Sequence, residues 1–360
     1  MDLKCKLIME EYREQKEDFV QLGDVVSGIL RELTSRNENM YILAIEHRVK
    51  AEKSLAGKLE LKGEKYSSLA DITDILGCRV ICFFADDVDN IARSIEEVFE
   101  IDRENSVDKR ADIGAETFGY LSLHYICSLP FGKQWPNNIC GKKFEIQIRT
   151  TLQHTWAVID HDIGYKSDFG LPRSIKRSFS HVAALLEVAD EKFVTIRNDI
   201  FAYVDDARDR IASDRADDLP IDHIALRIYM ETSKAMQGFL SSFAALCSDC
   251  EVQPISPSDY VPQLKWLGVN KLGDLSKLLK DHGELALKLA ETTLAATDLD
   301  ILSSNVALRY LCRAKLCNEN RSFEEISAFL KLSYGSEEKA QRQAKRLLAL
   351  YERVRSAEND

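Results

Sequence analysis

Two segments near the middle of this 360-residue chain constrain its fold more than any other feature. Residues 120–129 (YLSLHYICSL) and 143–150 (KFEIQIRT) alternate between two faces with a period of two, which is typical of β-strands. A third run at residues 79–84, RVICFF, is mostly apolar and predicts a buried strand, and a weaker strand is expected at 99–103. Because helical patterns surround these strands, we expect a domain that mixes helices with a sheet.

Helical periodicity dominates the rest of the chain. Within the first 200 residues it is predicted over residues 1–60, 69–76, 86–100, 151–163 and 173–200. After a charged connector at 205–218, the chain is expected to be all-helical over residues 221–247, 273–295, 300–317, 322–332 and 336–356. We therefore predict an α+β protein in two parts, with residues 1–205 around the sheet and residues 206–360 as a helical region of unknown role.

Composition excludes several classes of protein. Hydrophobic residues make up 45% of the chain and charged residues 30%, which excludes general disorder. The net charge of −11, from 48 basic and 59 acidic residues, argues against general binding of nucleic acid. No uncharged run approaches the roughly 20 residues of a membrane helix, and the first residues do not look like a secretory signal. Nine irregularly spaced cysteines are typical of reduced thiols, so we expect a cytoplasmic protein.

The polar members of the two alternating segments form the first candidate site. If both strands belong to one sheet, these side chains line an open face: Tyr120, Ser122, His124, Glu145, Gln147 and Arg149. The alternative interpretation is an antiparallel sheet whose polar face is simply solvated.

The second candidate site is the basic segment RVKAEKSLAGKL. Its cationic and hydroxyl side chains are Arg48, Lys50, Ser54 and Lys58. The last three are spaced four residues apart, so they form one stripe if the segment is helical. Ammonium and hydroxyl groups that face a cleft suit a polyphosphate chain. The alternative is a solvated amphipathic helix whose neighbouring glutamates neutralise the charge.

The third candidate site is the segment DITDILGCRV, which places two carboxylates before a predicted strand. Asp74 at the edge of this strand and Glu145 on another strand would supply oxygen ligands for Mg²⁺. Asp71 has a simpler alternative interpretation, because a carboxylate at this point can cap a helix.

Five motifs occur in the order and spacing of a known family. They are RVK-x3-S-x3-K, D-I-x-D-I-x-G-x-R-V, G-Y-x-S-x-H, E-I-Q-I-R-T and H-x3-Y-K, within about residues 40–200. On these motifs the chain resembles the RelA/SpoT-type alarmone synthetases. The resemblance implies a nucleotidyltransferase-like mixed β-sheet flanked by helices, in a small synthetase with a helical C-terminal extension. It also implies a pyrophosphokinase that moves the β,γ-pyrophosphate of ATP to the 3′-hydroxyl of GDP or GTP, making (p)ppGpp and AMP.

The resemblance also implies roles for the residues on the ATP side. Arg48 and Arg79 would sandwich the adenine between planar guanidinium groups. The ATP phosphates would be held by Lys50, Ser54 and Lys58.

On the acceptor side, the resemblance implies that Asp74 and Glu145 bind Mg²⁺ and that Glu145 accepts the proton of the 3′-hydroxyl. Tyr120 would stack on the acceptor base. The remaining acceptor contacts would come from His124, Gln147 and Arg149.

The sequence departs from the family pattern just before Gly119, where residues 115–118 read AETF instead of ending in Lys-Pro-Asn. Lys109 and Arg110 could replace the missing charge, and position 121 is leucine where a long polar residue is common. Two alternatives therefore stay open. One is the same transfer to another acceptor, either the 3′ end of tRNA or an adenosine nucleotide, by a toxin-like enzyme. The other is a catalytically silent protein that binds nucleotides for regulation.

Two other sequence features do not change this interpretation. The His161–Asp162 pair resembles part of a hydrolase metal site, but the upstream helical unit with its further histidines is absent from this sequence. Cys247, Cys250, Cys312 and Cys317 have irregular spacing, so we interpret them as small buried side chains and not as a zinc site. The expected partners are ATP and GDP or GTP, without a membrane, and assembly into homo-oligomers is left open.

Overall fold

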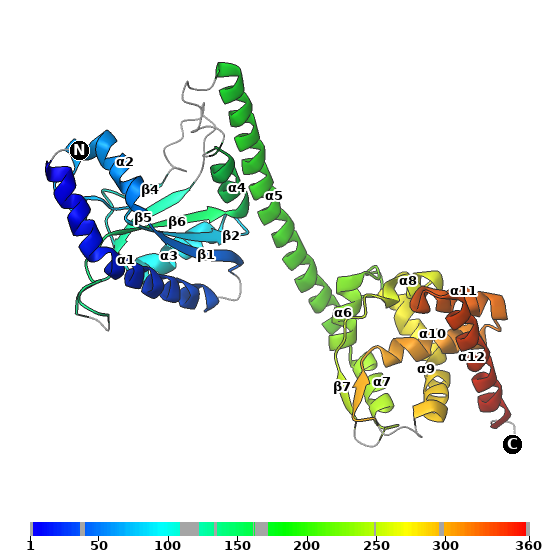
Figure 1. The fold of residues 1–360 in the computed structure, drawn as a ribbon. Coiled ribbons are helices and arrows are strands. Elements are labelled where there is room, and N and C mark those ends of the chain that lie inside the picture. Colours follow the sequence, from blue (N-terminus) through cyan, green and yellow to red (C-terminus); the bar gives the residue numbers. More distant parts are fainter. Residues whose placement is uncertain are drawn as a thin grey trace. The chain divides into compact units, whose positions relative to one another are not determined.

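We analysed a computed structural model that describes residues 3–36, 40–108, 122–132, 135–160, 162, 172–247, 250–294 and 299–357. The chain divides into two compact units, Met1–Asn198 and Asp199–Asp360 (Figure 1). Each unit has its own hydrophobic core.

A mixed sheet forms the centre of the first unit, as predicted. Its path runs in the order β1 (Ile42–Val49), β2 (Leu76–Cys82), β6 (Phe144–Thr150), β5 (Leu123–Ser128) and β3 (Glu100–Ile101), and β4 (Val107–Asp108) also pairs with β5. The β2–β6 pair is parallel, and the other pairs are antiparallel. The two strands with the strongest alternation, β5 and β6, are therefore direct neighbours.

Two helices cover one face of this sheet, α1 (Leu3–Ser35) and α3 (Asp87–Val98) (Figure 1). Helix α3 turns Val88, Ile91 and Ile95 toward the core, as the 3.6-residue periodicity predicted. In the same core lie the apolar side chains of β6, Phe144, Ile146 and Ile148. The opposite face of β6 is left to its polar side chains.

The sequence-based prediction is wrong for residues 42–49. This segment was predicted to continue a helix, and it forms the edge strand β1. Ile42, Ile45 and Val49 fit both a helical and an irregular strand spacing, which short apolar runs often do. β-branched side chains and pairing with β2 decide for the strand. Helix α2 (Glu52–Lys62) then begins after Lys50, so the predicted stripe is helical only from Ser54 onward.

Two further boundaries differ from prediction. The helix expected at 69–76 is only a 3₁₀ turn, Leu69–Asp71, and the strand expected from residue 79 already begins at Leu76. Asp71 is part of a capping box with Ser68, which confirms its capping interpretation. Helix α4 (Thr151–Ile159) follows β6, and α5 (Arg173–Ala212) extends into the expected connector.

The second unit is helical, as predicted. Its helices are α6 (His223–Thr232), α7 (Lys234–Ala244), α8 (Tyr260–Trp266), α9 (Leu272–Leu294), α10 (Val306–Asn318), α11 (Phe323–Tyr334) and α12 (Glu337–Ala357). It also contains a small parallel pair, β7 (Glu251–Gln253) and β8 (Ile301–Ser303). Strand β8 occupies the start of the segment predicted as a helix from residue 300, and β7 lies between two predicted helices. Over the described part of the chain, no helix has the length and apolar character needed to cross a membrane.

Candidate active site

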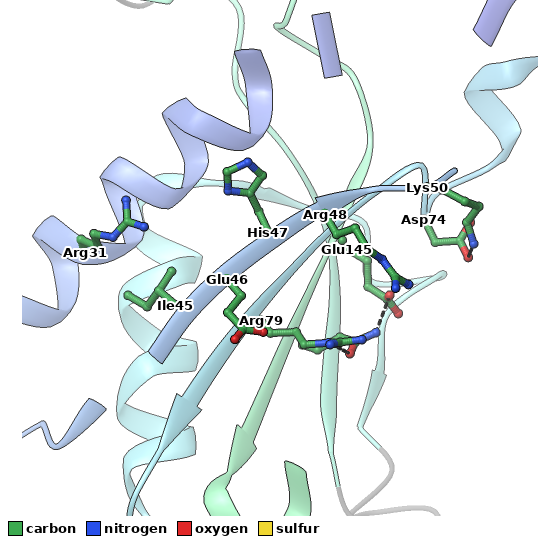
Figure 2. Close-up of a pocket in the computed structure, with 11 residues that line it drawn as sticks. Arg31, Ile45, Glu46, His47, Arg48, Lys50, Asp74, Arg79 and Glu145 are labelled. Carbon is green, nitrogen blue, oxygen red and sulfur yellow. Dashed lines mark hydrogen bonds and ion pairs between the residues drawn. The ribbon is translucent and has the colours of Figure 1, made fainter. Parts of the chain in front are cut away.

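A pocket of about 620 Å³ opens on the polar face of the sheet in the first unit. Its lining comes mainly from β1, β2 and β6 and comprises Arg31, Ile45, Glu46, His47, Arg48, Lys50, Asp74, Gly77, Arg79, Glu145 and Gln147. In Figure 2 the side chains of Arg48, Arg79 and Glu145 converge, while Lys50 and Asp74 lie together to one side.

Strand register explains why residues far apart in sequence share this pocket. The parallel β2–β6 pair places Gly77 beside Glu145 and Arg79 beside Gln147. The antiparallel β1–β2 pair places Arg48 beside Gly77 on its other side. Residues that are direct partners across a sheet point to the same face, so the Arg48 and Glu145 side chains flank the glycine. Open space lies above Gly77, and a side chain there would enter the pocket between its two neighbours.

One end of the pocket is a cluster of two ammonium groups around a carboxylate. Lys50 Nζ lies 2.7 Å from Asp74 Oδ2, and Lys58 Nζ lies 2.7 Å from Asp74 Oδ1. Burial alone would raise the pKa of the Asp74 carboxyl, but the two hydrogen-bonded lysines outweigh it and lower that pKa. Burial alone would likewise lower the pKa of Lys58, and Asp74 raises it above the ordinary value. Asp74 and Lys58 are therefore both charged at neutral pH.

Backbone contacts hold this cluster in place. The Lys50 carbonyl accepts a hydrogen bond of 2.5 Å from the Tyr12 hydroxyl, and the Lys50 amide donates to the Ile75 carbonyl at 2.8 Å. The Lys58 ammonium lies 5.4 Å from the centre of the Tyr66 ring, a cation–π distance. Lys58 does not itself line the pocket and belongs to the cluster through Asp74, whereas Ser54 is exposed on α2 and lies outside both.

The other end of the pocket centres on Glu145, whose two oxygens each accept one hydrogen bond. His124 Nδ1 lies 2.8 Å from Oε1, and Gln147 Nε2 donates to Oε2 at 2.7 Å. Arg79 Nε in turn donates to Gln147 Oε1 at 3.4 Å. Burial by itself would raise the pKa of Glu145, but the contacts with His124 and Gln147 lower it below the ordinary value. Glu145 is therefore an anion placed to accept a proton or a cation.

Behind Glu145, His124 has two more neighbours. Its Nε2 atom lies 2.8 Å from the Ser122 hydroxyl and 3.4 Å from Arg149 Nη2. The structure thus brings together five of the six polar residues that the strand alternation predicted on one face. Tyr120, the sixth, lies outside the described residues, as do Lys109, Arg110, His161 and residues 115–118.

Sequence reasoning missed several residues around the pocket. Because β1 is the edge strand, residues from both of its faces border the pocket, which adds Ile45 and His47 to Glu46 and Arg48. Arg31 reaches the pocket from α1 and carries no motif in the sequence.

His154 was also missed, although it lies within the FEIQIRTTLQHTW run. Burial and the charges of Arg79 and Arg149 lower its pKa, so this imidazole is near the site and neutral at pH 7. Its Nδ1 atom is buried without a hydrogen-bond partner among the described residues. That His154 lies near Arg79 and Arg149 follows from how its helix packs on the strands. The spacing of residues in the sequence does not show this packing.

The donor atoms of the pocket fit a hard divalent cation. Asp74 and Glu145 offer carboxylate oxygens, and they interact electrostatically with one another. Mg²⁺ is commonly held by one or two carboxylates together with substrate phosphates. Within the described ranges, no group of three or more histidine, cysteine, aspartate or glutamate residues forms a closed metal site. The two carboxylates therefore suit a metal that arrives with a phosphate ligand.

Comparison with known proteins was made on sequence and on structure. A sequence model of the family described as "Region found in RelA / SpoT proteins" matches residues 47–169. GTP pyrophosphokinase YwaC of Bacillus subtilis is 30% identical over 164 residues, which cover 43% of this chain and 75% of that protein. GTP pyrophosphokinase YjbM of the same organism is 26% identical over 204 residues, which cover 55% of this chain and 91% of that protein.

Among solved structures, the crystal structure of the small alarmone synthetase 1 from Bacillus subtilis has a TM-score of 0.46 at 23% identity, covering 54% of this chain and 99% of that one. The small alarmone synthetase 2 from the same organism has a TM-score of 0.45 at 27% identity, covering 53% of this chain and 99% of that one.

Proposed function

Because this chain belongs to the family of proteins that carry the RelA/SpoT region, we propose that it is a pyrophosphokinase that makes (p)ppGpp. In the proposed reaction the 3′-hydroxyl oxygen of GDP or GTP bonds to the β-phosphorus of ATP. The bond between that phosphorus and the oxygen bridging to the α-phosphate breaks, AMP leaves, and the hydroxyl proton goes to Glu145. The observation that carries this proposal is a single pocket that combines a lysine-bound carboxylate with an anionic glutamate.

The proposed ATP side is the half of the pocket that carries the cations. Arg48 and Arg79 converge beside Glu145, where the two halves of the pocket meet, and suit stacking on a planar adenine (Figure 2). Lys50 and Lys58 are both held on Asp74, and ammonium groups of this kind bind phosphate oxygens as readily as carboxylates. We infer that the lysines turn from Asp74 to the ATP phosphates when the nucleotide binds.

Mg²⁺ is the proposed cofactor, held by Asp74 and Glu145. When bound, it would neutralise charge on the phosphate oxygens of ATP. This proposal agrees with the lysine exchange, because Asp74 keeps a compensating cation after the ammonium groups leave it.

The proposed acceptor side is the half of the pocket that centres on Glu145. Its lowered pKa leaves it ionised at neutral pH, as a general base requires. Gln147 lies beside it on the same strand face, and the predicted stacking residue Tyr120 belongs to the same sequence motif as His124. A phosphoryl-type transfer depends mostly on positioning and charge neutralisation, which this arrangement supplies.

An acceptor screen tests this proposal. The protein would be mixed with Mg²⁺, ATP labelled in its terminal phosphates, and one of GMP, GDP, GTP, ADP, ATP or deacylated tRNA. We expect label on GDP or GTP with release of AMP. Label only on tRNA or an adenosine nucleotide would keep the mechanism and replace the acceptor. No transfer to any acceptor would contradict the proposed activity and favour a regulatory nucleotide-binding protein.

A further inference from the structure

Three side chains form a hydrogen-bonded chain that ends on Glu145: Ser122 lies just before β5, His124 on β5 and Glu145 on β6. The Ser122 hydroxyl lies 2.8 Å from His124 Nε2, and His124 Nδ1 lies 2.8 Å from Glu145 Oε1. Each imidazole nitrogen thus has one side-chain partner, and the carboxylate is the partner of Nδ1. The chain links the end of the motif G-Y-x-S-x-H to the glutamate of E-I-Q-I-R-T.

The neighbours of the imidazole determine where its proton lies. Arg149 Nη2 is 3.4 Å from His124 Nε2, and a guanidinium group carries only N–H donors and a permanent charge. Nε2 must therefore be the accepting nitrogen, toward which both the Arg149 guanidinium and the Ser122 hydroxyl donate. In a neutral ring with Nε2 as acceptor, the proton lies on Nδ1 and is donated to Glu145, which as a carboxylate can only accept.

Burial separates these residues into two groups. Ser122 is 1% exposed and Arg149 is 7% exposed, so neither presents a free polar surface to a nucleotide. The side chains of His124 and Glu145 are 14% and 18% exposed, and Glu145 lines the pocket. Ser122 and Arg149 therefore contact the reacting region through His124.

We propose that Ser122 and Arg149 are positioning residues that fix the tautomer of His124, so that Nδ1–H always donates to Glu145. This inference rests on the proposed function, because it assigns what holds the base of that reaction. With His124 on one oxygen and Gln147 on the other, the carboxylate cannot rotate freely. One lone pair on each oxygen stays available, so the same orientation serves each turnover.

The opposite tautomer of His124 shows why donors to Nε2 are needed. With the proton on Nε2, the Nδ1 lone pair would face the Glu145 carboxylate at 2.8 Å, and the N–H would face the Arg149 guanidinium. Both contacts would be repulsive, and Glu145 would lose one of its two donors. Outer-shell partners of this kind typically contribute about 10- to 100-fold to activity when they orient a functional group.

The test combines kinetics with two substitutions that remove the donors to Nε2, Ser122→Ala and Arg149→Met. We expect kcat to fall about 10- to 100-fold in each, with KM for both nucleotides within about twofold of wild type. Ser128→Ala is the matched control, since this hydroxyl lies at the far end of β5 from Ser122 and contacts Glu100. A rise in KM for the acceptor at unchanged kcat would overturn the proposal, because it would make Arg149 a substrate-binding residue.

A double-mutant cycle separates positioning from general loss of structure. An asparagine amide nitrogen occupies the place of imidazole Nδ1, so His124→Asn keeps a donor to Glu145 that no longer depends on Ser122. We expect Ser122→Ala to have less than about a twofold effect in the His124→Asn background. Equal effects of Ser122→Ala in both backgrounds would overturn the proposal.

NMR spectroscopy determines the tautomer of His124 without any catalytic reaction. In protein labelled with ¹⁵N at its seven histidines, the signals of His124 are assigned by their loss in His124→Asn. We expect an unprotonated Nε2 and a protonated Nδ1 in the wild type, and a change of the Nε2 signal in Arg149→Met. A wild-type Nε2–H would overturn the proposal. Because this measurement needs no acceptor, it stands even if the acceptor screen contradicts the proposed reaction.

Discussion

The two carboxylates of the pocket are held in opposite ways. Asp74 is paired with two lysine ammonium groups, each at the end of a flexible four-carbon chain. Glu145 is held by an imidazole and an amide whose side chains are short and start from adjacent β-strands. Long mobile partners can exchange one anion for another, whereas short partners on a sheet preserve a fixed orientation. We therefore infer that the Asp74 end of the pocket allows its ionic partners to exchange, whereas the Glu145 end holds its carboxylate in a fixed orientation.

Removing the rigidly held carboxylate should have the largest effect. We expect Glu145→Gln to lower turnover about 1,000-fold, because an amide cannot accept the hydroxyl proton. The affinity for ATP should change little, since Asp74 and both lysines remain. Labelled-ATP turnover and calorimetric titration with ATP measure the two effects. Glu100→Gln, on β3 of the same sheet, is the control, and a turnover within tenfold of wild type would contradict a base role for Glu145.

A larger side chain at Gly77, which lies between the two ends of the pocket, should have the next largest effect. In Gly77→Val the new side chain would project into the pocket between Arg48 and Glu145, where the structure leaves open space. We expect kcat/KM for ATP to fall about 100-fold with an unchanged melting temperature. Gly238→Ala, at an equally open position in helix α7 of the second unit, should leave kcat/KM unchanged and should not lower the melting temperature, because alanine favours a helix over glycine. An active Gly77→Val variant would show that the nucleotide lies elsewhere.

Removing one of the two lysines that contact Asp74 should have a smaller effect. In Lys58→Met, one of two ammonium groups is lost, and we expect KM for ATP to rise about tenfold. The pKa of Asp74 should rise toward its ordinary value, because one of the lysines that lower it is gone. A carboxyl with a lowered folded-state pKa stabilises the protein at higher pH and loses that contribution as pH falls through the folded pKa. The variant should therefore lose less stability on acidification than the wild type.

A matched control is available on the same helix. Lys53→Met removes an exposed ammonium group from α2, and neither KM nor the acid dependence should change. Urea unfolding at pH 7 and pH 3 measures the stability of each variant. An equal acid dependence in Lys58→Met and wild type would show that the Asp74 cluster does not contribute to folding stability.

The smallest expected effect concerns a third carboxylate, which has neither kind of partner. Asp190 on α5 is 4% exposed and accepts one hydrogen bond of 2.6 Å from the Thr150 hydroxyl. Burial raises the pKa of Asp190 to about 6, against a smaller lowering by Thr150. A raised folded-state pKa means that this group destabilises the fold as pH rises through about 6.

We expect Asp190→Asn to gain about 3 °C in melting temperature over the wild type on going from pH 5 to pH 8. Turnover should stay near the wild-type value, because Thr150 keeps its role as the N-cap of α4. Thermal unfolding at the two pH values measures the difference. A difference that does not depend on pH would contradict the raised pKa.

Much of the fold could be predicted from local patterns. The β5 and β6 segments alternate over most of their length, and α3 has a single apolar face, so each pattern favoured one structure. The helix predicted for residues 42–49 was wrong because the apolar residues of this segment fit both a helical and a strand periodicity. Pairing with β2 resolves the ambiguity, and that pairing is a long-range contact that no local pattern reports.

The residues of the candidate site could likewise be predicted only in part from local patterns. Motif spacing identified Asp74, Lys50 and Glu145, because charged side chains that interrupt apolar runs are visible in the sequence. The contact between Arg149 and His124 was not visible, since it depends on the register between β5 and β6. Ser122 was predicted on the same face as His124, but its hydrogen bond to Nε2 depends on how the imidazole is turned. His154 and Arg31 approach the pocket from helices that could have packed at many angles.

For β5 and β6, the side chains that share a face could therefore be predicted from the sequence alone, because strand alternation is a property of the backbone. Which side chains touch depends on tertiary structure, since strand order and register bring Gly77 between Arg48 and Glu145. It also decided the charge states. Asp74 and Asp190 are the same residue type, and their pKa values move in opposite directions because one meets two lysines and the other a single hydroxyl. Burial and partners are set by packing, and packing exists only once distant segments have met.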